Sequence, residues 1–112
     1  MKKLLAPFEI AMAALLALVL LAPAALRADD ASATLYKTKC AACHGPDGKG
    51  ETAIGKANKL RDLGLADVQK ASDADLAAII SAGKNKMPAY GKSLTPDQIK
   101  GLVTFVRGLA KK

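Results

Sequence analysis

The only two cysteines and the only histidine of the 112-residue chain lie within five consecutive residues, Cys40–His44. Cys40 and Cys43 are three positions apart, about one turn of a helix, so both thiols are expected on one side of the chain. His44 follows directly, and its imidazole can turn toward the same space. Three groups that can bind a metal or a cofactor are therefore gathered at one point of the sequence.

Residues 29–112 contain few large apolar side chains. Of the 35 apolar residues in this stretch of 84, 14 are Ala, so 21 larger ones remain to build a core. Domains of about 80 residues usually need a disulfide, a metal, a cofactor or a partner to be stable. The sequence therefore predicts one small domain that one of these four devices stabilises. It excludes an enzyme with separate nucleotide and substrate domains.

Residues 1–28 have the layout of a secretory signal peptide. Two lysines precede an uninterrupted apolar stretch of 13 residues, 10–22, and small residues offer a cleavage site after Ala28. The alternative is an uncleaved membrane anchor, but this stretch is shorter than the roughly 20 residues that span a bilayer. Both interpretations place the domain over residues 29–112 outside the cytoplasm, and we expect it in the periplasm.

The charge of the domain is positive. Without the leader, the 17 basic and 10 acidic residues of the chain fall to 14 and 9, a net charge of +5. The basic residues are dispersed along the chain, which excludes a nucleic-acid-binding tail. Two interpretations remain: an ordinary soluble surface, or attraction to an acidic protein partner, which raises encounter rates at low salt.

The pattern of residues 29–112 predicts an all-α domain of three or four helices. Ser32 is expected to cap a first helix that runs to about Ala41. A short helix is expected at residues 65–70, and Ser72 is expected to cap another that stops at Gly83.

The last helix has the strongest start signal in the chain. Residues 95–98 form a capping box with Pro96 at the first helical position. An apolar stripe at helical spacing follows, formed by Ile99, Leu102, Val103, Val106 and Leu109. The turn-rich loop at residues 45–50 and the aperiodic residues up to 63 are long for so small a domain and need something to pack on.

The spacing of Cys40, Cys43 and His44 is that of c-type haem attachment. Each thiol can form a thioether with a haem vinyl group, and His44 then becomes the proximal ligand of the iron. A structural disulfide is the first alternative, because the compartment is oxidising, but it would close a very small loop and supply no core. A thioredoxin-like dithiol expects a βαβ unit, and a zinc site needs about four ligands; the sequence predicts neither.

Met87 is the candidate sixth ligand. It is the only methionine of residues 29–112 and stands in a loop rich in Gly, Lys and Pro, residues 83–91. Pro88 favours an extended Met87 and stiffens the loop. The alternatives are a methionine that fills an apolar gap, an open sixth position, or a lysine ligand. With His44 and Met87 both bound, no coordination site is free for a substrate, and the thioether raises the reduction potential.

From Leu35 to Leu109 the chain resembles the class I c-type cytochromes, in particular short bacterial monohaem ones. Three motifs in order carry the resemblance: Leu35-Tyr36 ahead of the segment 40–45, Met87–Tyr90, and the helical segment 94–107. The resemblance implies the cytochrome c fold, with three or four helices wrapped around one covalently bound haem that has an exposed edge.

The resemblance also implies that the terminal helices cross, with Tyr36 on one helix and Leu102 and Phe105 on the other at the contact. The family often has Gly four residues before the first aromatic residue, where this chain has Ser32, so a looser crossing or a shifted register is expected. In some members a proline carbonyl accepts the ring N–H of the proximal histidine. Pro46 comes too early for this role and Pro88 too late.

The predicted function is a monomeric, periplasmic single-electron carrier, not an enzyme, whose one haem c cycles between Fe(II) and Fe(III). Four lysines that flank the haem-binding segments could dock it on an acidic redox partner: Lys37, Lys39, Lys84 and Lys86. One alternative is a cytochrome subunit bound to a dehydrogenase or an oxidase. The others are a haem peroxidase or sensor with a labile Met87, and a small disulfide-bonded interaction module.

Overall fold

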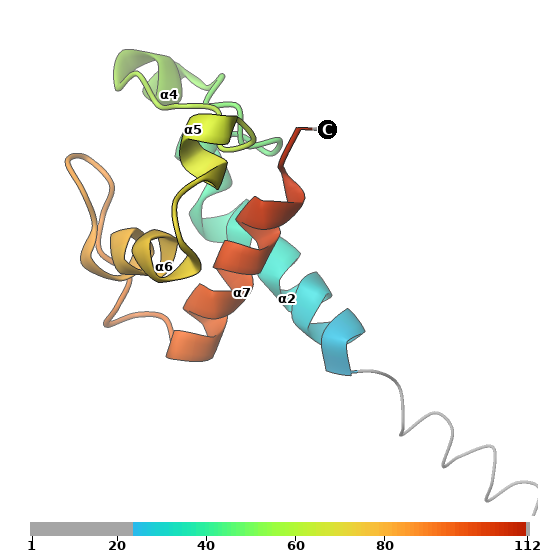
Figure 1. The fold of residues 1–112 in the computed structure, drawn as a ribbon. Coiled ribbons are helices and arrows are strands. Elements are labelled where there is room, and N and C mark those ends of the chain that lie inside the picture. Colours follow the sequence, from blue (N-terminus) through green and yellow to red (C-terminus); the bar gives the residue numbers. More distant parts are fainter. Residues whose placement is uncertain (1–23, 112) are drawn as a thin grey trace, which may run out of the picture.

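The computed structural model describes residues 24–111, which form six helices (Figure 1). Their bounds are α2 Ala24–Lys39, α3 Ala41–His44, α4 Ala53–Ala57, α5 Ala66–Gln69, α6 Asp73–Ala82 and α7 Pro96–Gly108. Over this range there is no strand, only an isolated bridge between Lys84 and Met87. The all-α prediction is therefore confirmed. No helix within residues 24–111 has the length and apolarity needed to cross a membrane. The predicted leader lies outside the described residues, apart from residues 24–28, which belong to α2.

Helices α6 and α7 begin where the sequence predicts. At α6 the Ser72 hydroxyl accepts a hydrogen bond from the amide of Asp75 at 3.0 Å, and Gly83 ends the helix. At α7 the Thr95 side chain accepts from the amide of Gln98 at 3.1 Å, while the Gln98 side chain accepts from the amide of Thr95 at 2.9 Å. The capping box is therefore complete, and each cap satisfies amides that have no partner inside the helix.

Three helices differ from the prediction. The first helix ends at Lys39 instead of running to about Ala41, and α3 follows it as a separate short helix. Ser32 lies inside α2, which already includes Ala24, because the Ala, Leu and Arg residues before Ser32 are good helix formers. Helix α4 falls in the stretch that shows no period, where Thr52 caps it by accepting from the amide of Gly55 at 2.8 Å. A helix of five residues is too short to show an apolar period, so its cap is the one sequence signal it leaves.

Helices α2 and α7 cross, as the resemblance implies (Figure 1). The Tyr36 and Phe105 rings stack with their centroids 4.3 Å apart, and Leu102 is buried beside them. Ser32 was expected to loosen the contact between α2 and α7. The helices still approach closely, because Gly101 on α7 lies opposite Ser32. A Cβ atom at Gly101 would collide with the Ser32 hydroxyl.

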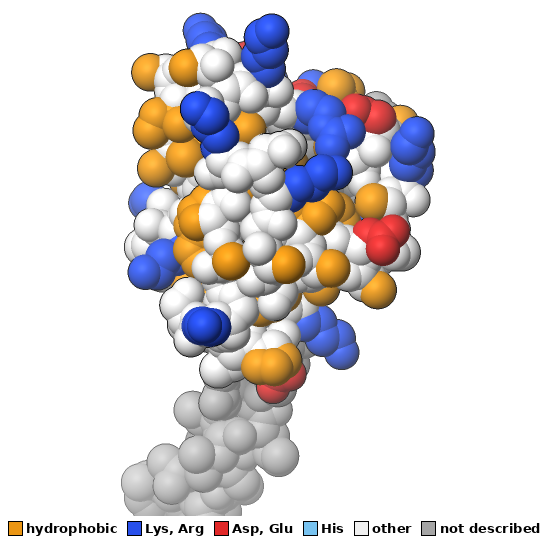
Figure 2. Space-filling view, turned by 90° about the vertical axis from the view of Figure 1, so that its left-hand side faces the viewer, with side chains coloured by type: hydrophobic (Ala, Val, Ile, Leu, Met, Phe, Trp, Pro, Cys, Tyr) orange, Lys and Arg blue, Asp and Glu red, His pale blue; other side chains and the backbone are white. Residues whose placement is uncertain are grey.

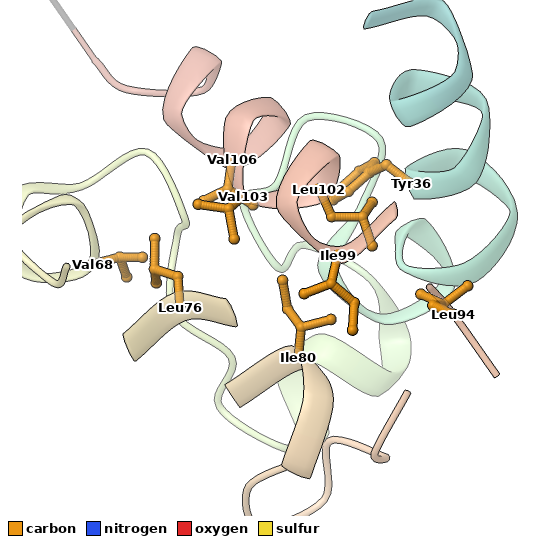
Figure 3. Close-up of a cluster of buried hydrophobic side chains, with 9 residues drawn as sticks. All are labelled: Tyr36, Val68, Leu76, Ile80, Leu94, Ile99, Leu102, Val103 and Val106. Atoms are coloured by element: carbon orange, nitrogen blue, oxygen red, sulfur yellow. The ribbon is translucent and has the colours of Figure 1, made fainter. Parts of the chain in front are cut away.

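The core is built around α7. Ile99, Leu102, Val103 and Val106 are buried on one face of this helix, while Leu109 at the end of the predicted stripe is half-buried. Their side chains meet those of Leu76 and Ile80 on α6, Val68 on α5, Tyr36 on α2 and Leu94 (Figure 3).

Arg107 fastens the segment between α5 and α6 to α7. Its guanidinium donates to the carbonyl oxygens of Gln69 at 2.6 Å and Ala71 at 2.5 Å, and to the Asp73 carboxylate at 2.9 Å. The donors of one guanidinium thus satisfy two main-chain acceptors, one at the last residue of α5 and one in the link to α6. This bracket holds α5 and α6 beside the core.

Candidate haem-binding site

A cavity of about 580 Å³ opens beside the core. Pockets of about 300–1,000 Å³ are typical for small molecules and cofactors. Helices α6 and α7 contribute five apolar side chains to its wall: Leu76, Ile79, Ile80, Leu102 and Val106. The same wall contains Cys40, His44 and Met87, which come from two regions of the chain more than forty residues apart.

A second pocket of about 70 Å³ shares Cys40, His44 and Met87 with the large cavity and adds Cys43 and Tyr90 to its wall. The structure therefore brings together all four side chains that the sequence predicts for the site. It places two thiols, one imidazole and one thioether around a single space.

Two side-chain hydroxyls donate hydrogen bonds to the main chain of residues 43–45. The Thr52 hydroxyl donates to the carbonyl oxygen of Cys43 at 2.7 Å, and the Tyr36 hydroxyl donates to that of Gly45 at 2.7 Å. Thr52 also caps α4, so α4 and the cysteine segment are fixed to each other. This role of Thr52 was not predicted. The only signal for it in the sequence is a threonine at the start of a short helix that was itself not predicted.

Burial favours the neutral forms of the His44 and Cys40 side chains. Burial lowers the pKa of the His44 imidazole, so the ring keeps a lone pair free at neutral pH. Burial, with a smaller contribution from Cys43, raises the pKa of the Cys40 thiol. Both cysteines are free. His44 Nδ1 is buried and has no hydrogen-bond partner among the described residues, so the proline acceptor found in some class I cytochromes has no counterpart there.

Met87 is presented by a tight two-residue turn. The amide of Met87 donates to the carbonyl oxygen of Lys84 at 3.0 Å, and the amide of Lys84 donates to that of Met87 at 3.2 Å. Asn85 in the turn has a φ of 54°, and Gly83 before it has a φ of 77°. A Cβ atom at Gly83 would lie 2.7 Å from the carbonyl oxygen of Met87, so this close approach requires glycine.

Residues 58–61 complete the wall of the cavity, which sequence analysis did not predict. They follow α4 without regular structure, and Lys59 has a φ of 54°. The amide of Leu60 donates to the carbonyl oxygen of Gly55 at 2.8 Å and turns the chain back along α4. The sequence shows no periodic pattern here, because the backbone of this segment makes isolated hydrogen bonds and not the repeating bonds of a helix or strand.

The surroundings of the two pockets are basic. Their charged wall residues are Lys39, Lys59, Arg61, Lys84 and Lys86, with Asp67 as the one acidic member. Asp67 pairs with Arg61 at 3.4 Å. Figure 2 shows the face formed by α4 and the loop before α7. On this face Lys and Arg side chains predominate over Asp and Glu, and apolar patches lie between them. Of the four predicted docking lysines, Lys37 lines neither pocket.

These observations define the class of protein. Within residues 24–111 no group of three or more His, Cys, Asp and Glu side chains could hold a metal ion, so a protein-only zinc site is not formed. The absence of strands over the same range leaves no βαβ unit for a thioredoxin-like dithiol. A cavity of cofactor size whose wall carries the Cys40 thiol, the imidazole and the thioether, with the Cys43 thiol in the adjoining small pocket, fits a haem. The domain is thus of the haem-binding, c-type class.

Known proteins similar to this chain belong to the same class. The sequence profile described as cytochrome C oxidase, cbb3-type, subunit III matches residues 27–106. Cytochrome c6 of Rippkaea orientalis is 38% identical over 97 residues, which cover 83% of this chain and 82% of that protein. The solved structure of the KustC0563 c-type cytochrome superposes with a TM-score of 0.67 at 35% identity, covering 71% of this chain and 98% of that one.

The chain is also similar to a subunit of a larger assembly. Cbb3-type cytochrome c oxidase subunit CcoP of Rubrivivax gelatinosus is 40% identical over 87 residues, which cover 74% of this chain but 28% of CcoP. The chain therefore spans less than a third of that relative. It belongs to the class I c-type cytochromes, electron-transfer proteins that hold haem c covalently.

Proposed function

We propose that the protein is a periplasmic one-electron carrier whose domain follows a signal peptide of residues 1–28. One haem c is attached through Cys40 and Cys43, with His44 as the proximal ligand and Met87 as the sixth ligand. With both axial positions filled, the protein performs no substrate chemistry. The observation that carries this proposal is that Cys40, His44 and Met87 share the wall of one apolar cavity.

The residues of the chain would each supply one part of electron transfer. When bound, the haem supplies the iron that accepts and releases the electron. His44, neutral because it is buried, offers a hard nitrogen donor, and Met87 offers a soft thioether that favours the ferrous state. The apolar walls from α6 and α7 exclude water, which limits the reorganisation that accompanies each change of charge.

The first test is the visible spectrum of protein matured with haem-ligation machinery, reduced, with and without carbon monoxide. We expect sharp c-type bands that the gas does not move, because Met87 closes the sixth position. In Met87→Ala the gas should shift the bands, and in the double variant Cys40→Ala/Cys43→Ala acidified solvent should extract any haem. Wild-type bands that shift with carbon monoxide would contradict Met87 ligation. Absent haem bands would contradict the whole proposal.

The basic surroundings of the cavity support docking on an acidic redox partner. Three exposed lysines lie at the walls of the pockets, Lys39, Lys84 and Lys86. A partner docked there would reach the edge of the bound haem. Charges of one sign around a contact site raise encounter rates at low salt and lose this effect as salt screens them. We expect the working form to be a monomer that meets its partners by diffusion.

The docking prediction is tested by neutralising Lys84 and Lys86 to Gln. Because two positive charges at the docking face are lost, electron transfer with an acidic partner protein should slow several-fold at low salt, and the salt dependence should flatten. Stopped-flow mixing over a range of ionic strength measures both. The control Lys100→Gln removes an exposed charge outside the pocket walls and should change the rate little. Equal rates and slopes in all three proteins would contradict this docking face.

A second candidate is a cytochrome subunit held in an oxidase or dehydrogenase complex. The similarity to CcoP and to the subunit III profile favours it. Affinity purification from detergent-solubilised membranes of the source cells distinguishes the two. A stoichiometric partner that survives high salt would favour the subunit, and recovery of the protein alone in the soluble periplasmic fraction would favour the carrier.

A further inference from the structure

We propose that the Tyr90 hydroxyl is a latch that keeps the Met87 loop closed over the cavity. It donates a hydrogen bond to the carbonyl oxygen of Lys39 at 3.2 Å. Lys39 is the last residue of α2 and directly precedes Cys40. The bond therefore ties the loop that carries Met87 to the helix that leads into the cysteine segment, across 51 residues of sequence. This inference rests on the proposed function, in which Met87 is the sixth ligand.

The end of α2 leaves an acceptor for this latch. The chain turns at Cys40, and the amides of Cys43 and His44 both donate to the carbonyl oxygen of Cys40, at 3.2 Å and 3.0 Å. The carbonyl of Lys39 is thereby left without the amide four residues ahead that a continuous helix would provide. The Tyr90 hydroxyl takes the place of that amide.

The backbone of Tyr90 is anchored independently of its hydroxyl. Its amide donates to the carbonyl oxygen of Ile80 at 2.9 Å, and its own carbonyl accepts from the amide of Leu94 at 2.9 Å. These bonds fix the base of the loop to α6 and to the start of α7. Among the described residues, the Tyr90 hydroxyl makes the one hydrogen bond between residues 83–91 and α2.

Met87 depends on this bond because its own main-chain bonds stay inside the loop. Both bonds join Met87 to Lys84, the residue on the other side of the two-residue turn. The turn can therefore move as a unit, and its bonds do not resist a swing away from the cavity. The Tyr90 ring is half-buried beside Cys40 and Cys43 in the small pocket, where it closes the side of the loop nearest to α2. Tyr90 is thus a positioning residue for Met87.

Loss of the hydroxyl in Tyr90→Phe should raise the population of the open loop about 2- to 13-fold, the range that one hydrogen bond supports. Exogenous imidazole measures this population in the oxidised holoprotein, because it enters only where Met87 has left. Its apparent affinity rises in proportion to the open fraction.

Three variants complete the experiment. Ser93→Ala removes a hydroxyl two residues beyond the loop that bonds only to the carbonyl of Tyr90, at 3.3 Å, and should leave the imidazole affinity unchanged. Met87→Ala sets the affinity of a fully open site. In a Met87→Ala background, Tyr90→Phe should have no further effect, since no ligand remains for the latch to hold.

The possible results separate the latch from the proposed function. Tighter imidazole binding in Tyr90→Phe that vanishes in the Met87→Ala background supports the latch. Unchanged binding in Tyr90→Phe, while Met87→Ala binds more tightly than wild type, overturns the latch and leaves Met87 ligation standing. An equal gain from Tyr90→Phe in both backgrounds also overturns it, because the effect then comes from a wider cavity. If Met87→Ala binds imidazole no more tightly than wild type, Met87 ligation fails and the latch with it.

Discussion

At the scale of single residues, hydroxyl groups hold the haem-binding segment in place. Tyr36, Thr52 and Tyr90 each donate to a main-chain carbonyl within or next to residues 39–45. This segment leaves a helix, makes one short turn and enters a loop, so its carbonyls lack regular partners. A side-chain donor satisfies each of these acceptors. Two of the donors are tyrosines that the sequence marks only as aromatic core or loop residues.

Tyr36→Phe should lower the free energy of unfolding of the holoprotein by about 1–3 kcal/mol, the cost of leaving a buried acceptor unsatisfied. Tyr36 is 2% exposed, and its partner Gly45 is buried, so water cannot replace the lost donor. Denaturant unfolding followed by far-ultraviolet circular dichroism measures the change. Thr38→Val is the control, because its exposed hydroxyl bonds to carbonyls of its own helix. An equal effect of both substitutions would contradict this role of Tyr36.

Stability should also fall at alkaline pH through Tyr36. Burial is the main cause that raises its pKa from 10.0 to about 12, and the charges of Cys40 and Asp47 add to it. A folded-state pKa above the unfolded value means that the contribution is complete below pH 10.0 and is lost as pH rises toward 12. Unfolding midpoints measured across this range should fall more steeply in wild type than in Tyr36→Phe. Parallel curves would show that Tyr36 ionises equally in both states.

At the scale of elements, α4 depends on a glycine for its position. A Cβ atom on Gly55 would collide with the main chain at Gly50 and lie 2.7 Å from the carbonyl oxygen of Cys43. All these neighbours are backbone, which cannot rotate away as a side chain can. The short helix therefore lies against the cysteine segment only because residue 55 has no side chain.

Gly55→Ala should cost about 3 kcal/mol, at the upper end of the penalty for an added methyl group in a closely packed site. It should also lower the yield of haem-loaded protein, because Cys43 is displaced. The matched control is Gly108→Ala at the end of α7, where a new Cβ meets nothing within 4 Å. Since Ala is the better helix former by about 1 kcal/mol, this control should be neutral or stabilising. A Gly55→Ala protein as stable and as well loaded as the control would contradict the argument.

The helices and loops differ in how well the sequence predicts them. Helices α6 and α7 could be predicted because capping side chains and apolar spacing are local signals. The cysteine segment and Met87 could be named because their atoms carry distinctive chemistry. The short α4 and the cavity wall at residues 58–61 could not, because contacts distant in sequence determine their positions. The extension of α2 before Ser32 has a local cause, the good helix formers that precede Ser32, and it escapes prediction because Ser32 is itself a typical capping residue. Gly55 is one of nine glycines, and only its neighbours in space set it apart.

At the scale of the whole molecule, the core and the haem site are one structure. Leu76, Ile80, Leu102 and Val106 belong to the buried cluster and also line the large cavity (Figure 3). The scarcity of large apolar side chains is thus explained, because the bound group completes the core that the chain leaves open. In the proposed attachment, thioether bonds to Cys40 and Cys43 would make that completion permanent.

The domain should therefore lose its cooperative fold when haem is absent. Without haem, the apolar side chains around the cavity of about 580 Å³ would lose the group they pack on and face water, and a domain has only roughly 5–15 kcal/mol of stability to lose. We expect the haem-free double variant Cys40→Ser/Cys43→Ser to keep part of its helix content but to show poorly dispersed amide resonances and no sharp thermal transition. The holoprotein, matured and measured in the same way, should show both features. A cooperative transition with dispersed resonances in the haem-free variant would mean that α6 and the Met87 loop can close onto α7 by themselves.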